Sequence, residues 1–305
     1  MAVSVVLPDR EEVLVLHAGS LSAPFSEIAR HFEAAEPGLV VRLFSGGSTE
    51  LARRVLCGEV QAHILASADY KVIDELLFPD HAAANILFAS NELVLCYTEQ
   101  SRHAGEIGPE NWPDVLARPG VRWGHSDPER DPCGYRSLMV LCLAERHYAK
   151  PGLMDELLSR RRPEWVPPKA ADLVGLLRNG QLDYAWEYLS VAKQHGLSFV
   201  RLDSRLSLGD LQHEKLYAAA RVQVGGRTLQ GGAVLYGVCL LQGAPERGAA
   251  AKFLGFLLDP AQGLRILAEA GQPVLTPVCV RTSGEHAALP ESLRAAVKVL
   301  EECPG

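Results

Sequence analysis

Short apolar runs alternate with helix-like segments over the first part of the chain. The runs at 13–16, 37–44 and 62–70 predict strands, and apolar positions recur at helical spacing from Leu21 and again from Ser48. A strand–helix–strand–helix–strand order is typical of a parallel, doubly wound sheet. We therefore expect an α/β fold that begins with such a sheet.

The middle and the end of the chain continue this alternation and add two long apolar stretches. Residues 86–98 are apolar over a length that allows the chain to leave the first sheet and enter another. Residues 135–148 and 171–196 predict a second α/β unit, and a second long strand is expected near 234–242, after a Gly-Gly hairpin. Two doubly wound lobes joined by two crossing strands explain this pattern.

The order of the elements makes the first lobe discontinuous in sequence. We expect residues 1–93 and 240–305 to form this lobe and residues 94–239 to form the second. In α/β sheets of this kind, ligands bind outside the carboxyl ends of the strands, so the cleft between the lobes is the expected binding site.

Composition and charge exclude several classes of function. The 305 residues are 48% hydrophobic and 22% charged, as in globular proteins, and a net charge of −7 without a long basic run argues against nucleic-acid binding. No apolar span reaches the length of a membrane helix. The seven cysteines form no C-x-x-C pair and the ten histidines show no metal-binding spacing, so we expect no zinc site. Buried thiols are expected, or one or two disulfides if the protein is exported.

The first residues of the chain, MAVSVVLPDREEV, lack the charged start and the long apolar core of a signal peptide. Two interpretations follow from this pattern. Either the protein is cytosolic, or a leader has been replaced by the starting methionine.

Both early strands end in a Gly-Ser corner where a helix is expected to begin. Gly19-Ser20 follows the first strand and Gly47-Ser48 follows the second. Helix N-termini present free N–H groups and a partial positive charge, and glycine allows a ligand to approach the backbone. The two corners therefore form a candidate anion site that needs no lysine or arginine. Ordinary turn and helix-cap chemistry is the alternative.

Several segments give the chain a family resemblance. It resembles the solute-binding proteins of molybdate/tungstate ABC transporters, especially the branch first known from archaea, in the segments HAGSL, SGGSTELARRV, ASADY, DPCGYRSLM, DYAWEYLSVAKQHGL, VQVGGRTLQGGAVLYGV and FLGFLLDPAQGLRILAEAGQP. The resemblance extends from about residue 13 to about residue 280, and DPCGYRS together with EYLSVA is its most specific part. It implies a type II periplasmic-binding-protein fold, in which two α/β lobes close on the ligand.

The resemblance also implies which residues bind the oxyanion. One serine at each corner of the first lobe would donate a hydrogen bond, and the second lobe would add backbone N–H groups at two helix starts and a tyrosine hydroxyl. The matching positions in this sequence are Ser20, Ser48, Cys133 or Gly134, Ala170 and Tyr188.

Two carboxylates distinguish the archaeal branch, and they match Asp131 and Glu187. Molybdate and tungstate are dianions that only accept hydrogen bonds, as carboxylates do, so the two would repel each other. The resemblance implies instead that the carboxylate oxygens bind the metal centre, which expands from four oxygens towards six. A protonated carboxyl that donates a hydrogen bond is the other solution. We expect Asp131 and Glu187 to select tungstate and molybdate over sulfate.

Three functions are compatible with these observations. The resemblance implies a monomeric, non-enzymatic receptor that delivers tungstate or molybdate to an ABC permease at the periplasmic or extracellular face of the membrane. A cytosolic oxyanion sensor or storage protein is the alternative. An enzyme is disfavoured because the sequence contains no nucleophile elbow, phosphate loop or cofactor fingerprint. We expect Arg53 and Arg136 to be solvated or ion-paired, and Asp69 to support the floor of the crevice.

Overall fold

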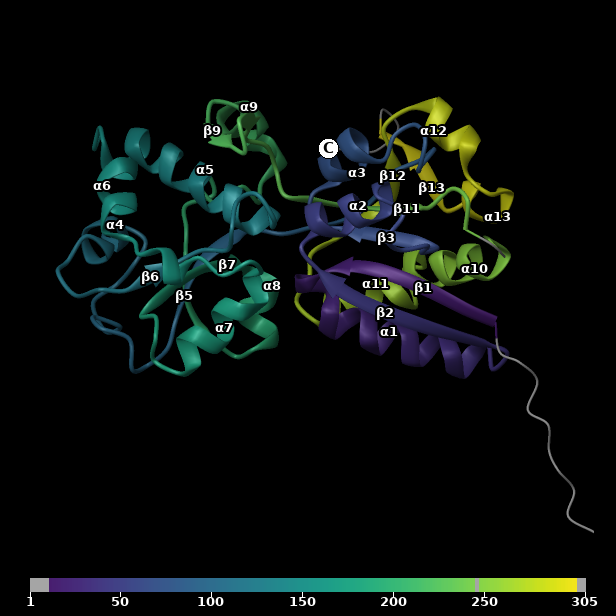
Figure 1. Cartoon of the computed structure of the whole chain (residues 1–305), viewed down its shortest axis with the longest axis horizontal. Helices are drawn as coiled ribbons and strands as arrows, with labels where there is room; N and C mark the ends of the chain where they lie inside the picture. The colour runs from purple at the N-terminus through teal and green to yellow at the C-terminus, as the bar shows by residue number, and fades with distance from the viewer. Residues whose placement is uncertain (1–10, 245–246, 301–305) are drawn as a thin grey trace, which may run out of the picture.

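The computed structural model describes residues 11–244 and 247–300. Residues 1–10 and 301–305 of the predicted first lobe, Cys303 among them, therefore lie outside the described residues. The described chain forms two lobes, one around a seven-stranded sheet and one around a four-stranded sheet (Figure 1). Among these residues, no helix is both long enough and apolar enough to span a membrane.

The first lobe is built on the seven-stranded sheet, whose strand order is β13-β12-β4-β11-β3-β1-β2. Its strands are β1 (Glu11–Ala18), β2 (Leu39–Gly46), β3 (Ile64–Ser67), β4 (Ile86–Ser90), β11 (Leu235–Leu240), β12 (Val274–Val280) and β13 (Val297–Val299). Its helices are η1 (Gly19–Leu21), α1 (Ser22–Ala35), α2 (Ser48–Leu56), α3 (Tyr70–Leu76), α10 (Arg247–Leu258), α11 (Gly263–Glu269), α12 (Ser283–Ala288) and α13 (Glu291–Arg294).

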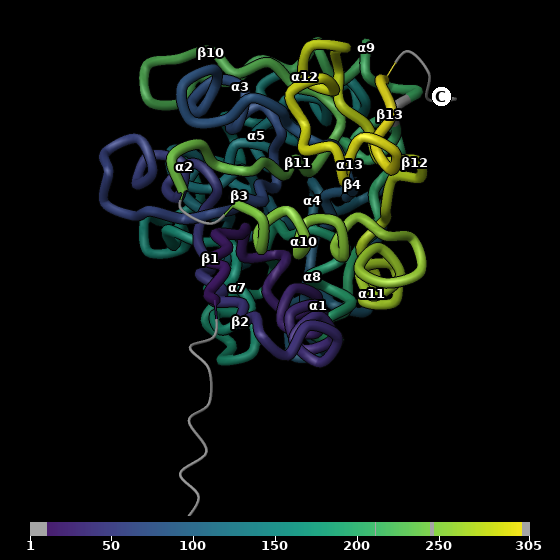
Figure 2. The backbone as a smooth tube through the Cα atoms, turned by 90° about the vertical axis from the view of Figure 1, so that its right-hand side faces the viewer, coloured from purple at the N-terminus to yellow at the C-terminus, as the bar shows by residue number. Residues whose placement is uncertain are grey.

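Helices cover both faces of this sheet, as the predicted periodicity requires. Helices α1, α10 and α11 pack together on one face, and α2 and α3 lie on the other (Figure 2). Side chains on both faces of the strands are buried. On β1, Val13 and Val15 pack into the core under α1, while Leu16 points to the other face and packs with α2.

The second lobe is built on the four-stranded sheet, whose strand order is β6-β7-β5-β8. Its strands are β5 (Leu93–Tyr97), β6 (Trp123–Gly124), β7 (Tyr184–Tyr188) and β8 (Ser198–Arg201). Its helices are α4 (Trp112–Leu116), α5 (Pro132–His147), α6 (Leu153–Arg160), η2 (Pro163–Trp165), α7 (Ala170–Arg178) and α8 (Leu189–Gln194). The segment that follows holds η3 (Leu211–His213), α9 (Glu214–Tyr217) and the hairpin β9 (Arg221–Val224) and β10 (Arg227–Gln230), of which β9 contacts α5.

The chain crosses between the lobes at two places. The first crossing joins β4 to β5 through Asn91 and Glu92, next to the predicted boundary. The second precedes β11, because this strand lies in the seven-stranded sheet from Leu235 onward. The predicted boundary between residues 239 and 240 is therefore wrong: it divides a strand of the first lobe, and the return to that lobe comes before residue 235.

Strand directions follow from these crossings. Strands β1, β2 and β3 are parallel, as predicted. Strand β11 enters the sheet from the second lobe, at the edge where β3 and β4 end, and it consequently runs antiparallel to both. In the second lobe β5 is likewise antiparallel to β7 and β8, while β6 and β7 are parallel. Both sheets are thus mixed rather than purely parallel.

Candidate functional site

The two Gly-Ser corners lie together at the edge of the first sheet that faces the second lobe. Ser20 lies in η1 directly after β1, and Ser48 is the first residue of α2 after β2; both side chains are buried. Neither hydroxyl caps a helix. The Ser48 oxygen accepts a hydrogen bond of 3.0 Å from the N–H of Ala68 after β3, and the Ser20 hydroxyl bonds the Tyr236 hydroxyl at 2.8 Å. The corners are therefore not explained by ordinary helix capping.

Asp131 connects the starts of two helices in the second lobe. It is the N-cap of α5, where one carboxylate oxygen accepts from the N–H of Cys133 at 2.9 Å, and its other oxygen accepts from the N–H of Ala170 at 3.0 Å, where α7 begins. The N–H of Gly134 donates to the Asp131 carbonyl at 3.0 Å. All three backbone donors that the sequence proposed for the oxyanion thus donate to Asp131 in this structure.

Glu187, the last residue but one of β7, has a fully buried side chain. One of its oxygens accepts from the N–H of Tyr188 at 3.3 Å, and the other, Oε1, has no hydrogen-bond partner among the described residues. Burial, and after it the charge of Asp131, raises the pKa of Glu187 well above its usual range. Burial also raises the pKa of Asp131, although the N–H groups of Ala170 and Cys133 lower it. Cys133 links the two segments, because its N–H bonds Asp131 and its thiol donates to the carbonyl of Trp186, next to Glu187, at 3.6 Å.

The lobes touch over this site, so the structure is a closed form. A Cβ atom at Gly47 would lie 2.3 Å from the Arg130 carbonyl oxygen in the second lobe, and one at Gly19 would lie 3.7 Å from the Ala171 methyl group. The first corner thus faces the start of α7 and the second faces the start of α5. The first-lobe serines and the second-lobe carboxyls consequently come together from opposite sides.

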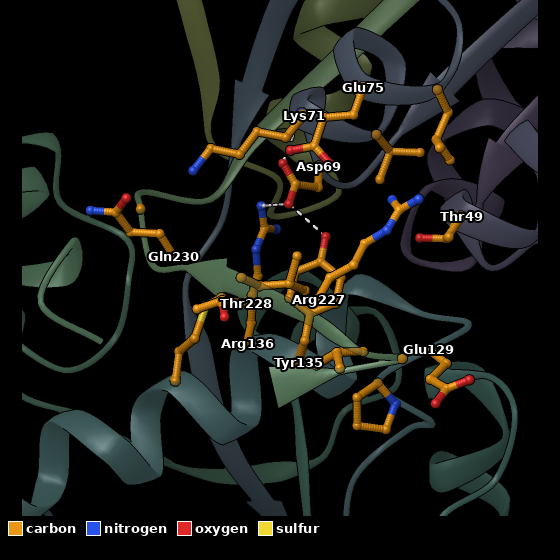
Figure 3. Close-up of a pocket in the computed structure, with 18 of the residues that line it drawn as sticks. Thr49, Asp69, Lys71, Glu75, Glu129, Tyr135, Arg136, Arg227, Thr228 and Gln230 are labelled. Carbon is orange, nitrogen blue, oxygen red and sulfur yellow. Dashed lines mark hydrogen bonds and ion pairs between the residues drawn. The ribbon is translucent and has the colours of Figure 1, made fainter. Parts of the chain in front are cut away.

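Tyr188 belongs to a second set of contacts between the lobes. Its hydroxyl accepts a hydrogen bond of 3.0 Å from Arg136 on α5, whose guanidinium also pairs with Asp69 of the first lobe at 3.2 Å. Asp69 accepts a further bond of 2.5 Å from the Tyr135 hydroxyl (Figure 3). Of the two roles predicted for Arg136, solvated or ion-paired, the structure shows the ion pair. Arg136, Asp69 and Tyr135 also line an interlobe cavity of about 460 Å³ that includes Lys71 of α3.

Two further buried residues were not found from the sequence. Tyr236 bonds Ser20, and its hydroxyl accepts from the side-chain amide of Asn91 at 3.0 Å; that amide also donates to Ser190 at 2.8 Å. Asn91 is a polar residue inside the apolar stretch 86–98, and this exception to the pattern could have indicated a functional residue. Tyr236 gave no such signal, because a tyrosine in an apolar strand is ordinary.

Two α/β lobes that close over buried hydroxyls and carboxyls define a two-lobed solute-binding protein. The chain belongs to the family of bacterial extracellular solute-binding proteins, which it matches over residues 13–271. These proteins bind their ligands without transforming them, so the chain is not an enzyme.

Individual proteins that are similar to this chain show to which members of the family it is related. An uncharacterized solute-binding protein of Petrotoga mobilis is 41% identical over 272 residues, covering 87% of this chain and 84% of its own. The molybdate/tungstate-binding protein WtpA of Pyrococcus abyssi is 35% identical over 318 residues, covering 95% and 91%. The structure of the periplasmic molybdate-binding protein of Azotobacter vinelandii has a TM-score of 0.60 at 19% identity, covering 85% and 98%. The predicted resemblance and the type II fold are confirmed.

Proposed function

We propose that this protein binds tungstate or molybdate between its lobes and delivers the ion to an ABC permease. The relationship to molybdate/tungstate-binding proteins supports the ligand class. The observation that carries the proposal is the pair of buried carboxyls: Asp131 is fixed by two helix N-termini, and Glu187 keeps a buried oxygen without a partner among the described residues. A buried polar atom of this kind is costly unless a ligand satisfies it.

The carboxyl pair of Asp131 and Glu187 can bind the metal centre of tungstate or molybdate, but it has no comparable interaction with sulfate. Each Asp131 oxygen accepts one backbone N–H and retains a further lone pair, so the carboxylate can bind the metal while the helices hold it in place. On this proposal Cys133, Gly134 and Ala170 act through Asp131 rather than by direct donation to the oxyanion. The sulfur of sulfate does not expand its coordination, so both carboxylates would only repel that ion.

The hydroxyls supply the donors that the oxyanion needs. Ser48 already accepts from the N–H of Ala68, so its own hydrogen is free to donate towards the cleft. Tyr236 accepts from Asn91 and can donate to Ser20, which leaves the Ser20 hydrogen for the anion in the same way. Tyr188 completes the set from the second lobe. Four oxygens of a dianion would thus meet donors from both lobes.

Isothermal titration calorimetry of the ligand-free protein with tungstate, molybdate and sulfate tests this proposal. We expect one-to-one binding of tungstate and of molybdate, and no heat of binding for sulfate. Sulfate binding of similar strength would contradict the role of the carboxyls in selectivity. If none of the three ions binds, the relationship to molybdate/tungstate-binding proteins is one of fold alone.

Membership of the extracellular solute-binding family supports delivery to a permease, and it supports the proposed location at the periplasmic or outer face of the membrane. We expect membrane vesicles that contain the permease to accumulate tungstate only when the protein is supplied on the side from which the ion enters. Binding without any effect on uptake would instead favour the cytosolic sensor or storage protein. The monomeric state stays a prediction, and size-exclusion chromatography with light scattering tests it.

A further inference from the structure

Arg136 has a position that the anion site described so far does not explain. Its side chain is only 4% exposed although it carries a permanent charge, so its environment must compensate the loss of hydration. The guanidinium extends from α5 of the second lobe into the first lobe (Figure 3). There Nη1 donates to the Ala68 carbonyl at 2.6 Å and Nη2 pairs with Asp69 at 3.2 Å.

The same guanidinium also contacts Tyr188, a residue of its own lobe that is proposed to bind the anion. Nη1 donates to the Tyr188 hydroxyl at 3.0 Å. A phenol has one hydrogen, so a tyrosine oxygen that accepts from a cation keeps this hydrogen for another acceptor. The Tyr188 hydroxyl is thereby oriented as a donor, and the charge of Arg136 makes it a stronger one.

The contact with Ala68 has a similar effect on the other lobe. The carbonyl of Ala68 accepts from Arg136, and the N–H of Ala68 donates to the Ser48 oxygen at 3.0 Å. Arg136 thus fixes the turn that orients Ser48 while it orients Tyr188 directly. One side chain connects a hydroxyl of each lobe, and it does so only when the lobes are in contact.

We propose that Arg136 is the positioning residue that couples lobe closure to the anion site. In the closed form Arg136 orients the hydroxyl groups of Ser48 and Tyr188 as hydrogen-bond donors. This orientation favours an ion that only accepts hydrogen bonds. Arg136 also holds the lobes together through Asp69, which slows the release of the ion. This proposal rests on the proposed function, because it assigns to Arg136 an action on the ligands of that oxyanion.

A double-mutant cycle tests the action through Tyr188. We expect Arg136→Gln and Tyr188→Phe each to weaken tungstate binding, Arg136→Gln by about 10–100-fold, since a hydrogen bond to a charged group is lost. Because both changes remove the same oriented donor, the double variant should bind about as weakly as Arg136→Gln alone. Titration calorimetry gives the affinities, and stopped-flow tryptophan fluorescence should show that Arg136→Gln raises the dissociation rate more than it lowers the association rate.

Two further variants separate positioning from charge. Arg136→Lys keeps the charge but cannot bond Ala68, Asp69 and Tyr188 together, so it should also dissociate faster while it associates at the wild-type rate. The matched control is Arg130→Gln. Arg130 forms another contact between the lobes, a partly exposed pair with Glu50 at 3.4 Å, and this change should alter the affinity by less than about twofold.

Specific results would overturn the proposal. Additive effects of Arg136→Gln and Tyr188→Phe would show that Arg136 does not act through Tyr188. A slower association rate with unchanged dissociation in Arg136→Gln, restored by Arg136→Lys, would show that Arg136 only attracts the anion. Equal melting temperatures of the ligand-free variants show that folding is not the cause. If the wild-type protein binds none of the ions, the proposed function fails and this proposal fails with it; if the wild type binds and the cycle is additive, only this proposal fails.

Discussion

At the scale of single residues, the site depends on how two acids are kept in a buried space. The charge of Asp131 contributes to the raised pKa of Glu187, but the surroundings of the two acids differ. Two backbone N–H groups stabilise the charge of Asp131, whereas Glu187 receives one longer bond of 3.3 Å and leaves one oxygen without a partner among the described residues. The charged form of Asp131 is therefore better stabilised than that of Glu187, and Glu187 gains most from a ligand.

Replacing Glu187 by glutamine separates the two ways in which a carboxyl can face an oxyanion. If Glu187 binds the metal centre, Glu187→Gln should weaken tungstate binding by more than the roughly 10–100-fold typical of losing an outer-shell partner of a metal site. Calorimetry measures this loss. An amide resembles a protonated carboxyl as a donor, so an unchanged affinity would favour the protonated acid instead. Sulfate serves as the control, and a gain in sulfate affinity would show that Glu187 excludes that ion.

At the scale of elements, the strand–helix units of the first lobe were predictable because each has its own periodicity. The helix from Ser48 to Leu56 and the strands before it lie where the pattern places them. The direction of β11 was not predictable, since its apolar run is the same in either direction. Its direction depends on the lobe from which the chain arrives, which is a property of the whole topology.

The candidate site was predictable to a similar extent. The two corners suggested an anion site from their residue types, and the family resemblance added the residues of DPCGYRS. The partners of those residues were not predictable, because they are distant in sequence: Asp131 bonds the start of a helix at Ala170, and Ser20 bonds Tyr236. Only the three-dimensional structure shows that the predicted backbone donors are used by Asp131.

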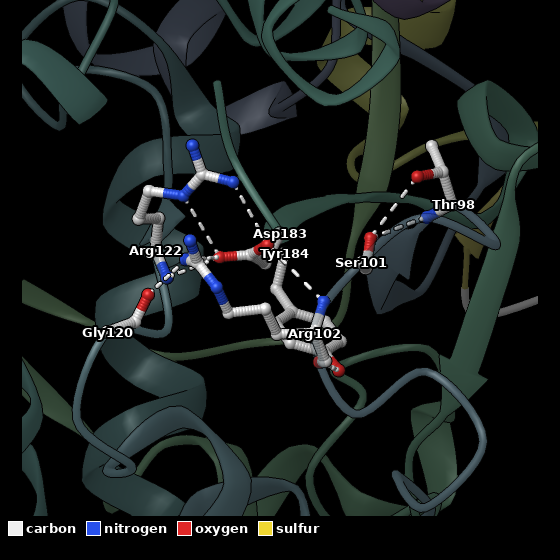
Figure 4. A network of polar contacts seen from close by, with 7 residues as sticks. All are labelled: Thr98, Ser101, Arg102, Gly120, Arg122, Asp183 and Tyr184. Carbon is white, nitrogen blue, oxygen red and sulfur yellow. Dashed lines mark hydrogen bonds and ion pairs between the residues drawn. The ribbon is translucent and has the colours of Figure 1, made fainter. Parts of the chain in front are cut away.

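Asp183 connects several segments of the second lobe (Figure 4). Its buried carboxylate precedes β7 and accepts hydrogen bonds from the side chains and the backbone N–H groups of Arg102 and Arg122. Burial, the largest single influence, raises the pKa of Asp183, but the bonds from Arg122 and Arg102 together outweigh it and hold this pKa below its usual range. The carboxylate therefore stabilises the lobe only while it is ionised.

We expect Asp183→Asn to lower the free energy of unfolding by about 1.5–3 kcal/mol at neutral pH, since hydrogen bonds to a charged group are lost. The native pKa is depressed, so the stabilisation is present above the unfolded pKa of about 4 and is lost as the pH falls through the native value. Urea unfolding at pH 7 and at pH 3 measures the difference between wild type and variant, which should shrink at the lower pH. Asp114→Asn, which removes an exposed pair with Lys150, should have little effect at either pH. An equal loss of stability at both values would contradict the role of the charge.

At the scale of the whole molecule, the proposed ligand shell is complete only when the lobes meet. The serines belong to the first lobe and the carboxyls to the second, so an open form would separate the proposed serine donors from the proposed metal ligands. The crossing at Asn91 and Glu92 lies beside the site, since Asn91 bonds Tyr236, and a small change in backbone angles there would move one lobe against the other. Closure and binding are consequently expected to be one coupled equilibrium.

Gly47 offers a way to block closure without disturbing either lobe. Its backbone angles, φ −68° and ψ 132°, suit any residue, so the close approach of Arg130 from the other lobe is what requires a glycine here. Gly47→Ala should leave the ligand-free protein stable but weaken tungstate binding by about tenfold or more, because the competent closed state becomes rarer. Small-angle X-ray scattering should show a smaller radius of gyration when tungstate binds the wild type, and a reduced change in the variant. Gly38→Ala, where a Cβ atom meets nothing within 4 Å, is the control. If the radius of the wild type does not change with tungstate, or if Gly47→Ala binds and contracts as the wild type does, closure is not the step that completes the site.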